Sequence, residues 1–115
     1  MDHLKIINEA DGLSSLGLHE DAWEVLEGLP PLLKLRPEVL RVRLMICGGL
    51  GRWEMGGEIA KLASPDSPPA FKEEAGRFHL AHAKALCAAG NFDAARQSVM
   101  VLAWLWPSGL LSAGP

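Results

Sequence analysis

The feature that most limits how this chain can fold is a short motif that occurs three times at nearly regular intervals. Each copy has a glycine, a ring-bearing side chain two positions later, an acidic residue next, and a small residue five positions after the glycine. The copies start at Gly17, Gly51 and Gly90, so the intervals are 34 and 39 residues. A period of this length indicates that one supersecondary unit, stacked on copies of itself, builds the chain.

Each position of the motif has a physical role at a turn between two helices. Glycine accepts the left-handed backbone conformation that ends one helix and turns the chain. The acidic residue begins the following helix, where the helix dipole favours negative charge by about 0.3–1 kcal/mol. The small residue lets the second helix lie close to the first. The small residues of the three copies are Ala22, Gly56 and Ala95.

The spacing of apolar residues predicts helices rather than strands. Leu4, Ile7, Ala10 and Leu13 recur three residues apart, and no segment alternates apolar and polar residues for long. Glycine and proline residues separate the periodic segments. Because the loops are short, neighbouring helices are expected to form antiparallel hairpins. The predicted helices span residues 2–15, 19–29, 37–48, 52–63, 69–89 and 92–105.

These repeats resemble those of the tetratricopeptide repeat family, in which helix–turn–helix units of about 34 residues stack side by side. The resemblance covers nearly the whole chain and rests on the glycine, ring and small positions of the motif. It also rests on prolines 17 positions after two of the glycines, Pro68 and Pro107. The resemblance implies an all-α fold, a right-handed α-α superhelix (solenoid) of three antiparallel helix hairpins.

The same resemblance implies the domain organisation. One tetratricopeptide-like domain is expected over residues 1–107, and residues 108–115 are expected to be a flexible apolar tail. The three repeats are expected at about 1–34, 35–69 and 70–107. The alternative is a generic six-helix bundle in which the regular spacing has arisen by chance.

Composition limits the classes of function. The chain has 115 residues, of which 49% are apolar and 22% charged, as in a single globular domain. The formal charge of −3 argues against a protein whose main task is coating nucleic acid. Cys47 and Cys87 are too few for a disulfide framework and are expected to be buried free thiols in a reducing compartment. The N-terminus lacks the long apolar core of a signal peptide, and no uncharged apolar run reaches bilayer length without a proline or glycine interruption, so a cytoplasmic location away from membranes is expected.

Motifs that would support catalysis or metal binding are incomplete. The segment that starts at His19 begins like a zinc-protease motif, but Trp23 stands where the second histidine is required. His79 and His82 are three residues apart without a third ligand at a known spacing, so structural or solvated histidines are the favoured interpretation. The glycine-rich segment 49–54 follows a predicted helix rather than a strand, unlike a dinucleotide-binding loop. The expected protein is therefore not an enzyme and carries no metal or cofactor.

The resemblance implies a groove, lined by the first helix of each repeat, that holds a segment of another protein. The groove positions that follow by register are Ile7, Asp11, Gly48 and the five expected to carry binding, Arg41, Met45, Arg77, Leu80 and Lys84. Three cations beside two apolar side chains suit an acidic peptide with apolar anchors. The implied function is that of a non-enzymatic adaptor or scaffold for protein–protein interaction.

Residues 97–115 contain no charged residue and predict a second surface. The last helix of a free-standing solenoid needs a polar outer face, whereas this helix is apolar almost all round and should be covered on both sides. The cover is the tail pair Leu110–Leu111, a second copy of the chain or a different protein. A homodimer with Met100, Trp104 and Trp106 at its interface is the favoured interpretation. Homo-oligomerisation through this helix is therefore the alternative function.

Overall fold

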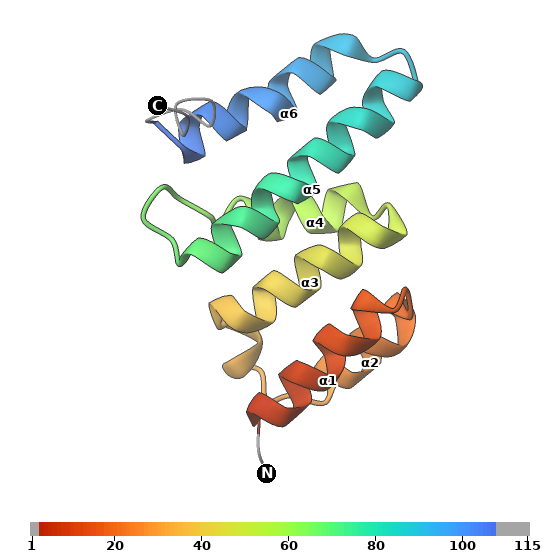
Figure 1. The fold of residues 1–115 in the computed structure, drawn as a ribbon, viewed down its shortest axis with the longest axis vertical. Helices are drawn as coiled ribbons and strands as arrows, with labels where there is room; N and C mark the ends of the chain where they lie inside the picture. The colour runs from red at the N-terminus through yellow and green to blue at the C-terminus, as the bar shows by residue number, and fades with distance from the viewer. Residues whose placement is uncertain (1–2, 108–115) are drawn as a thin grey trace.

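The computed structural model describes residues 3–107, and within this range the chain forms helices and no strand (Figure 1). The predicted tail, residues 108–115, lies outside the described residues. None of the described helices is both long enough and apolar enough to cross a membrane. The all-α fold class is thus confirmed. The helices are α1 (His3–Ser15), α2 (His19–Glu27), η1 (Leu33–Leu35), α3 (Pro37–Leu50), α4 (Trp53–Ala60), α5 (Pro69–Ala88) and α6 (Phe92–Leu105).

The observed helices lie close to the predicted ones, with the clearest difference at the end of α4. The sequence predicts a helix to residue 63, but α4 ends at Ala60. Beyond it, Leu62 and Ala63 each donate a backbone N–H to the carbonyl three residues earlier, so the chain tightens into turns of the 3-10 type. As a result α4 has only 8 residues, whereas α6 has 14 and α5 has 20. The short 3-10 helix η1 is not among the predicted helices.

Gly17, Gly51 and Gly90 follow the first helix of each pair and turn the chain in the same way. Their φ angles are 84°, 71° and 80°, and no other described residue has a positive φ. At each turn the residue after the glycine donates its N–H to a carbonyl five residues earlier, over N···O distances of 2.9, 2.9 and 2.8 Å. The predicted role of these glycines is confirmed, and one closure geometry recurs at all three turns.

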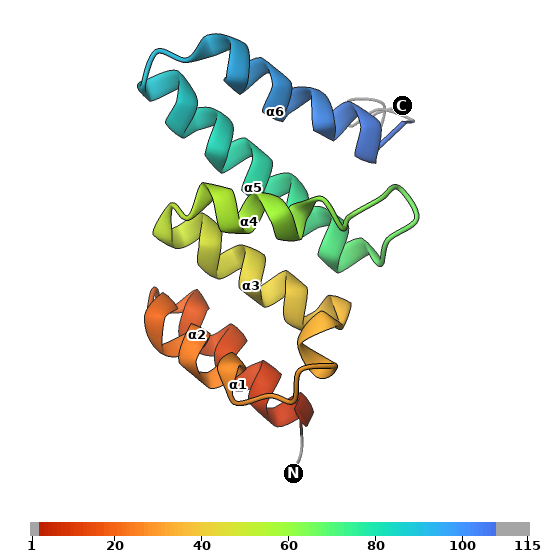
Figure 2. The same ribbon diagram turned by 180° about the vertical axis from the view of Figure 1, so that it is seen from behind.

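The helices pair in chain order, α1 with α2, α3 with α4, and α5 with α6. Figure 1 shows the pairs following one another along the longest dimension of the molecule, and Figure 2 shows the same order from behind. The first helices of the pairs are neighbours, because α3 packs against both α1 and α5. The helices α1, α3 and α5 therefore present one shared side of the molecule.

Two clusters of buried apolar residues hold the pairs together, and α3 belongs to both. The first cluster joins α1 and α2 to α3, where Val39 and Ile46 contribute to it. The second joins α3 to the C-terminal helices and includes Leu44 and Cys47. Trp23 of α2 packs against both clusters. The core is therefore continuous along the molecule, with α3 as its central element.

The small residue Gly56 permits the closest approach between neighbouring pairs. A Cβ atom at this position would clash with the ring of Phe78 in α5 and would lie 2.9 Å from the Cβ of Cys47 in α3. The equivalent small residues Ala22 and Ala95 are also buried. The prediction that a small residue is needed for close packing is confirmed, and at Gly56 the tightest contact comes from the following pair.

The two cysteines differ in environment. Cys47 is buried, and this burial raises the pKa of its thiol. Cys87 is a free thiol too but is exposed, so the prediction of burial was wrong for this residue. The reason is its position on α5, where Cys87 follows the exposed residues Leu80 and Lys84 at helical spacing.

Candidate functional site

The five predicted groove residues all lie on the two adjacent helices α3 and α5. Arg41 and Met45 belong to α3, and Arg77, Leu80 and Lys84 belong to α5. Leu80 and Lys84 are exposed. We call the side of the molecule that carries these five residues and Asp11 the first-helix face.

A small cavity opens on the first-helix face between α3 and α5. Its volume is about 160 Å³, and Met45, Gly48, Arg77 and Phe78 are among the residues that line it. It is large enough for one side chain rather than for a whole ligand. Ile7, another residue placed here by register, is buried in the core between the first two pairs. The face thus offers a shallow surface with one pocket.

A chain of ion pairs crosses the first-helix face and joins all three helix pairs. Arg41 Nη2 donates to Asp11 Oδ2 of α1 over 2.7 Å, and Arg41 Nη1 lies 3.9 Å from Glu74 Oε1 of α5. Glu74 Oε1 also accepts a hydrogen bond of 3.2 Å from Arg77 Nη1. Two cations of the face, Arg41 and Arg77, therefore meet two carboxylates, whereas Lys84 forms no ion pair within residues 3–107. An acidic ligand has to compete with these internal partners.

Glu74 is the central ion-pair residue of this face that the sequence did not predict. Its side chain is only 8% exposed, and burial raises the pKa of its carboxyl group, while Arg77 and Arg41 act in the opposite direction. A glutamate between two arginines on separate helices cannot be recognised from spacing along the sequence. Its position shows that Arg41 is held in place by carboxylates on both sides.

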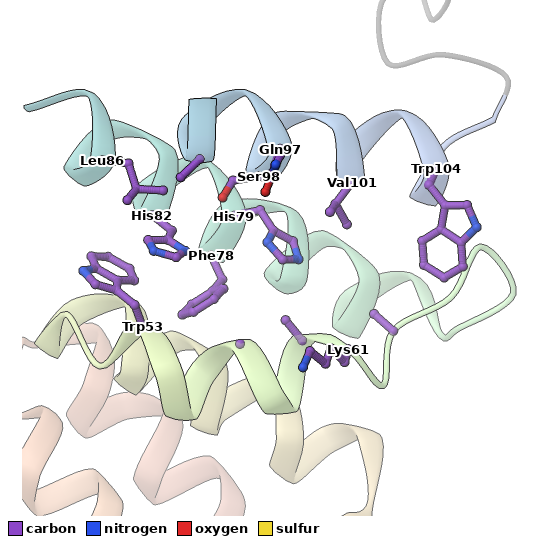
Figure 3. A pocket seen from close by; sticks show the side chains of 14 residues that line it. Trp53, Lys61, Phe78, His79, His82, Leu86, Gln97, Ser98, Val101 and Trp104 are labelled. Atoms are coloured by element: carbon purple, nitrogen blue, oxygen red, sulfur yellow. The ribbon is translucent and has the colours of Figure 1, made fainter. Parts of the chain in front are cut away.

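A larger cleft lies on another side of the molecule, between α4, α5 and α6 (Figure 3). We call it the α4–α6 cleft, and its volume is about 520 Å³, in the range typical of small-molecule sites. The sequence did not predict it, because it depends on how α4 and α6 are placed relative to each other beside α5. The residues that line it are Trp53, Gly57, Ala60, Lys61, Ala63, Phe78, His79, His82, Leu86, Ala94, Gln97, Ser98, Val101 and Trp104.

Two imidazole rings enter the α4–α6 cleft from α5. The ring of His82 stacks on Trp53, with centroids 4.9 Å apart and planes at 9°. The ring of His79 meets the edge of Phe78, and Figure 3 shows it pointing between α4 and α6. Burial, and to a lesser degree the charge of His82, lower the pKa of His79. Within residues 3–107 neither imidazole makes a hydrogen bond, and no group of three metal-ligating side chains comes together.

The ring residues at the start of each second helix have different surroundings in the first two pairs and in the last pair. His19 of α2 occupies the space beside Gly49 in the next pair, and its Nδ1 lies 2.9 Å from the hydroxyl of Ser14. Trp53 of α4 stacks on His82 in the next pair. Phe92 of α6 has no described pair after it and is 62% exposed. The end of the stack formed by α6 is therefore uncovered within the described chain.

The predicted oligomer residues divide between the two sides of the C-terminal region. Met100 and Trp104 are 64% and 56% exposed on α6. Trp106 instead packs inward, where its ring would lie 2.8 Å from a Cβ atom added at Gly76, and Lys72 Nζ lies 5.2 Å from the ring. We call the exposed apolar side of α6, formed by Phe92, Val99, Met100 and Trp104, the outer face of α6.

Comparison with known proteins gives no indication of function. The chain matches no protein-family model, no curated protein and no solved structure. Function is therefore argued from the first-helix face, the α4–α6 cleft and the outer face of α6.

Proposed function

We propose that this chain is a non-enzymatic protein-interaction module that holds a segment of another protein along its first-helix face. In this proposal the three pairs are tetratricopeptide-like repeats that wind into a right-handed superhelix. The observation that supports it most strongly is the closure shared by the turns at Gly17, Gly51 and Gly90. Three equivalent turns, each between the first and the second helix of a pair, are expected when one structural unit is stacked three times.

The ring residues give independent support for a stacked arrangement. His19 and Trp53 each pack against the pair that follows, and Phe92, at the end of the stack, is exposed. In a bundle around one centre, there is no physical reason for the ring of the first two motifs to pack against the following pair and for the ring of the last motif to be exposed. In a stack, each second helix has a following neighbour except the last one.

The chemistry of the first-helix face favours an acidic segment with apolar anchors. Arg77 and Lys84 are the exposed cations, whereas Arg41 is held by Asp11 and Glu74. An apolar side chain of the ligand fits the small cavity beside Met45. Because exposed charges mainly direct encounter and orientation, the anchor supplies most of the affinity.

The experiment that tests this proposal compares two variants with the same change in net charge. Arg77→Glu with Lys84→Glu reverses the exposed cations of the first-helix face, and Arg36→Glu with Lys61→Glu reverses two exposed cations elsewhere. Partners captured from the native lysate are identified by mass spectrometry and their binding segments are then measured as isolated peptides. We expect the first variant to lose the partner and the second to keep it. Equal capture by both variants contradicts the proposal.

The outer face of α6 supports a second function, self-association. Its apolar side chains are exposed, and a tryptophan such as Trp104 is a common anchor of protein interfaces. A second copy that covers this face would give the stack the following neighbour that α6 lacks. Light scattering at tens of micromolar tests this function, with a dimer expected for the chain and a monomer for Trp104→Glu. A wild-type chain that is monomeric under these conditions excludes it.

A further inference from the structure

The α4–α6 cleft has an uneven set of charges. No aspartate or glutamate lines it, whereas Lys61 and the two histidines His79 and His82 do. Lys61 is exposed and paired with Glu58 over 3.1 Å, and such an exposed pair holds its partners only weakly. Anionic groups therefore meet no fixed negative charge on the walls of the cleft.

The walls of the cleft suit an apolar body. Trp53 and Phe78 form one aromatic side, with ring centroids 5.6 Å apart, and Val101 and Trp104 line the opposite side on α6. Figure 3 shows these side chains on both sides of the space, with the ring of His79 between them. Pockets of this size with apolar walls and a few polar groups are typical sites for small molecules.

Gly57 gives an independent indication that the open space is itself required. A glycine inside a helix costs about 1 kcal/mol relative to alanine. The neighbouring Gly56 has a packing reason, because a Cβ atom there would clash with Phe78. A Cβ atom at Gly57 would meet no atom within 4 Å, although Gly57 lines the cleft. Glycine at this position therefore brings no packing advantage and leaves the space of the cleft free of a side chain.

We propose that the α4–α6 cleft binds a small apolar anion, an aromatic or medium-length aliphatic body that carries one carboxylate or sulfonate. The body lies between the aromatic side formed by Trp53 and Phe78 and the α6 side at Val101. The anionic group lies near His79, toward the end of α4 that carries Lys61. This site is independent of the first-helix face and of the protein partner proposed for it.

The polar groups of the site predict a pH dependence of binding. The titratable groups that line the cleft with His79 are His82 on the same helix and Lys61, which directly follows α4 and pairs with Glu58 of α4, and no titratable group of α6 lines the cleft. Because burial lowers the pKa of His79, its ring is neutral in the empty cleft at neutral pH. A bound anion favours the protonated ring, so affinity for an anion increases as the pH falls from 8 to 6.

The test uses two fluorescent probes that share one aromatic body. Anilinonaphthalene sulfonate is anionic throughout this pH range, and N-phenyl-naphthylamine is the same body without the sulfonate. At pH 6 we expect the anionic probe to bind about fivefold more tightly than the neutral probe. This preference for the anionic probe should decrease in the double variant His79→Gln with Lys61→Gln. Equal or tighter binding of the neutral probe overturns the proposal.

A filled cleft provides the second arm of the test. Gly57→Leu places a side chain in the open space, and we expect it to weaken binding of the anionic probe by about tenfold or more. Gly12→Leu is the matched control, because Gly12 lies in the exposed part of α1 and a Cβ there also meets no atom within 4 Å. Circular dichroism establishes that both variants are folded. Unchanged binding by Gly57→Leu overturns the proposal.

Two further measurements identify a different occupant of the cleft. Leu110→Asp with Leu111→Asp leaves probe affinity unchanged if the cleft is open, and a tenfold increase shows that the chain's own tail competes for it. Probe affinity that falls with increasing protein concentration shows that a second copy covers the cleft. Either of these results overturns the proposal, and unchanged affinity in both measurements supports it.

Discussion

The first-helix face and the α4–α6 cleft share one helix, α5, but differ in their chemistry. On the first-helix face, Asp11, Arg41, Glu74 and Arg77 form a continuous chain of charges across three helix pairs. In the α4–α6 cleft, the walls are mostly apolar and no carboxylate is present. Apart from Lys84, these charges of the first surface already have partners, whereas the apolar atoms of the second surface still contact solvent. A ligand therefore exchanges partners on the face and removes apolar area from water in the cleft.

The difference arises from which helices pack against each other. The first helices α3 and α5 pack along each other, and their charged side chains meet across this contact. The second helix α4 has only 8 residues, about 12 Å at 1.5 Å per residue, and packs against α3 and α5. Trp53, Gly57 and Ala60, at the start, middle and end of α4, line the cleft. The cleft is therefore the space left between α4 and α6.

Phe78 separates the two surfaces, because it lines both the cleft and the small cavity on the first-helix face. Phe78→Ala removes this buried ring and connects the two spaces. We expect it to lower the free energy of unfolding by about 3–5 kcal/mol. Phe92→Ala, the same change at an exposed ring, is expected to cost about 0.5 kcal/mol or less. Denaturant unfolding measures both, and similar losses would contradict the packing described for Phe78.

The adjacent glycines of α4 are expected to respond with opposite signs. Gly56→Ala forces a methyl group against Phe78 and Cys47, which lowers the free energy of unfolding by about 1–3 kcal/mol. Gly57→Ala places the same methyl group in open space and raises it by about 1 kcal/mol through helix propensity. Thermal and denaturant unfolding of the two variants gives the sign directly. A loss of stability in Gly57→Ala would show that the cleft is closed in solution.

The buried and exposed glutamates are expected to respond oppositely to pH. Burial raises the pKa of Glu74, so the stability contributed by its protonated form is present at low pH and is lost as the pH rises through the folded-state pKa. Hydrogen bonds from Arg43 and Lys34 lower the pKa of Glu27, whose contribution is present at neutral pH and is lost as the pH falls.

This contrast is measured as the difference in unfolding free energy between the wild type and each glutamine variant across pH 3–7. Relative to Glu74→Gln, the unfolding free energy of the wild type is expected to decrease as the pH rises. Relative to Glu27→Gln, it is expected to decrease as the pH falls. A pair of curves with the same slope would mean that the arginines Arg41 and Arg77 outweigh burial in setting the pKa of Glu74.

The smallest effect on stability is expected at Lys84. Its side chain is exposed on α5, and within residues 3–107 it forms no ion pair. Lys84→Ala should therefore change the free energy of unfolding by about 0.5 kcal/mol or less, independently of its effect on partner binding. Unfolding curves that differ by more would indicate an internal role for this lysine.

The sequence was sufficient to predict the helices and turns because these depend on local chemistry. Glycine is needed wherever φ is positive, and Gly17, Gly51 and Gly90 are the described residues with that conformation. The start of α6 is likewise local, since the Asn91 side chain accepts a hydrogen bond from the N–H of Ala94. Helix existence, turn position and the small residue Gly56 were therefore within reach of sequence analysis.

The candidate sites were only partly predictable because they depend on contacts between helices. The register identified Arg41 and Arg77 but not Glu74, which lies between them in space. The spacing of the helix containing Cys87 indicated an apolar position, yet among residues 3–107 no helix covers Cys87 on α5. The α4–α6 cleft depends on the space left between α4 and α6, which the spacing of residues along the sequence does not indicate.

The place of α3 in both core clusters has a consequence for how the molecule unfolds. Val39 and Ile46 secure it to the N-terminal pair, and Leu44 and Cys47 secure it to the C-terminal helices. If α3 opens, both halves lose their shared support, so the halves are expected to melt together in one cooperative transition. The amides of α3 should then exchange with solvent deuterium most slowly, at the rate set by global opening, while the terminal helices α1 and α6 fray first.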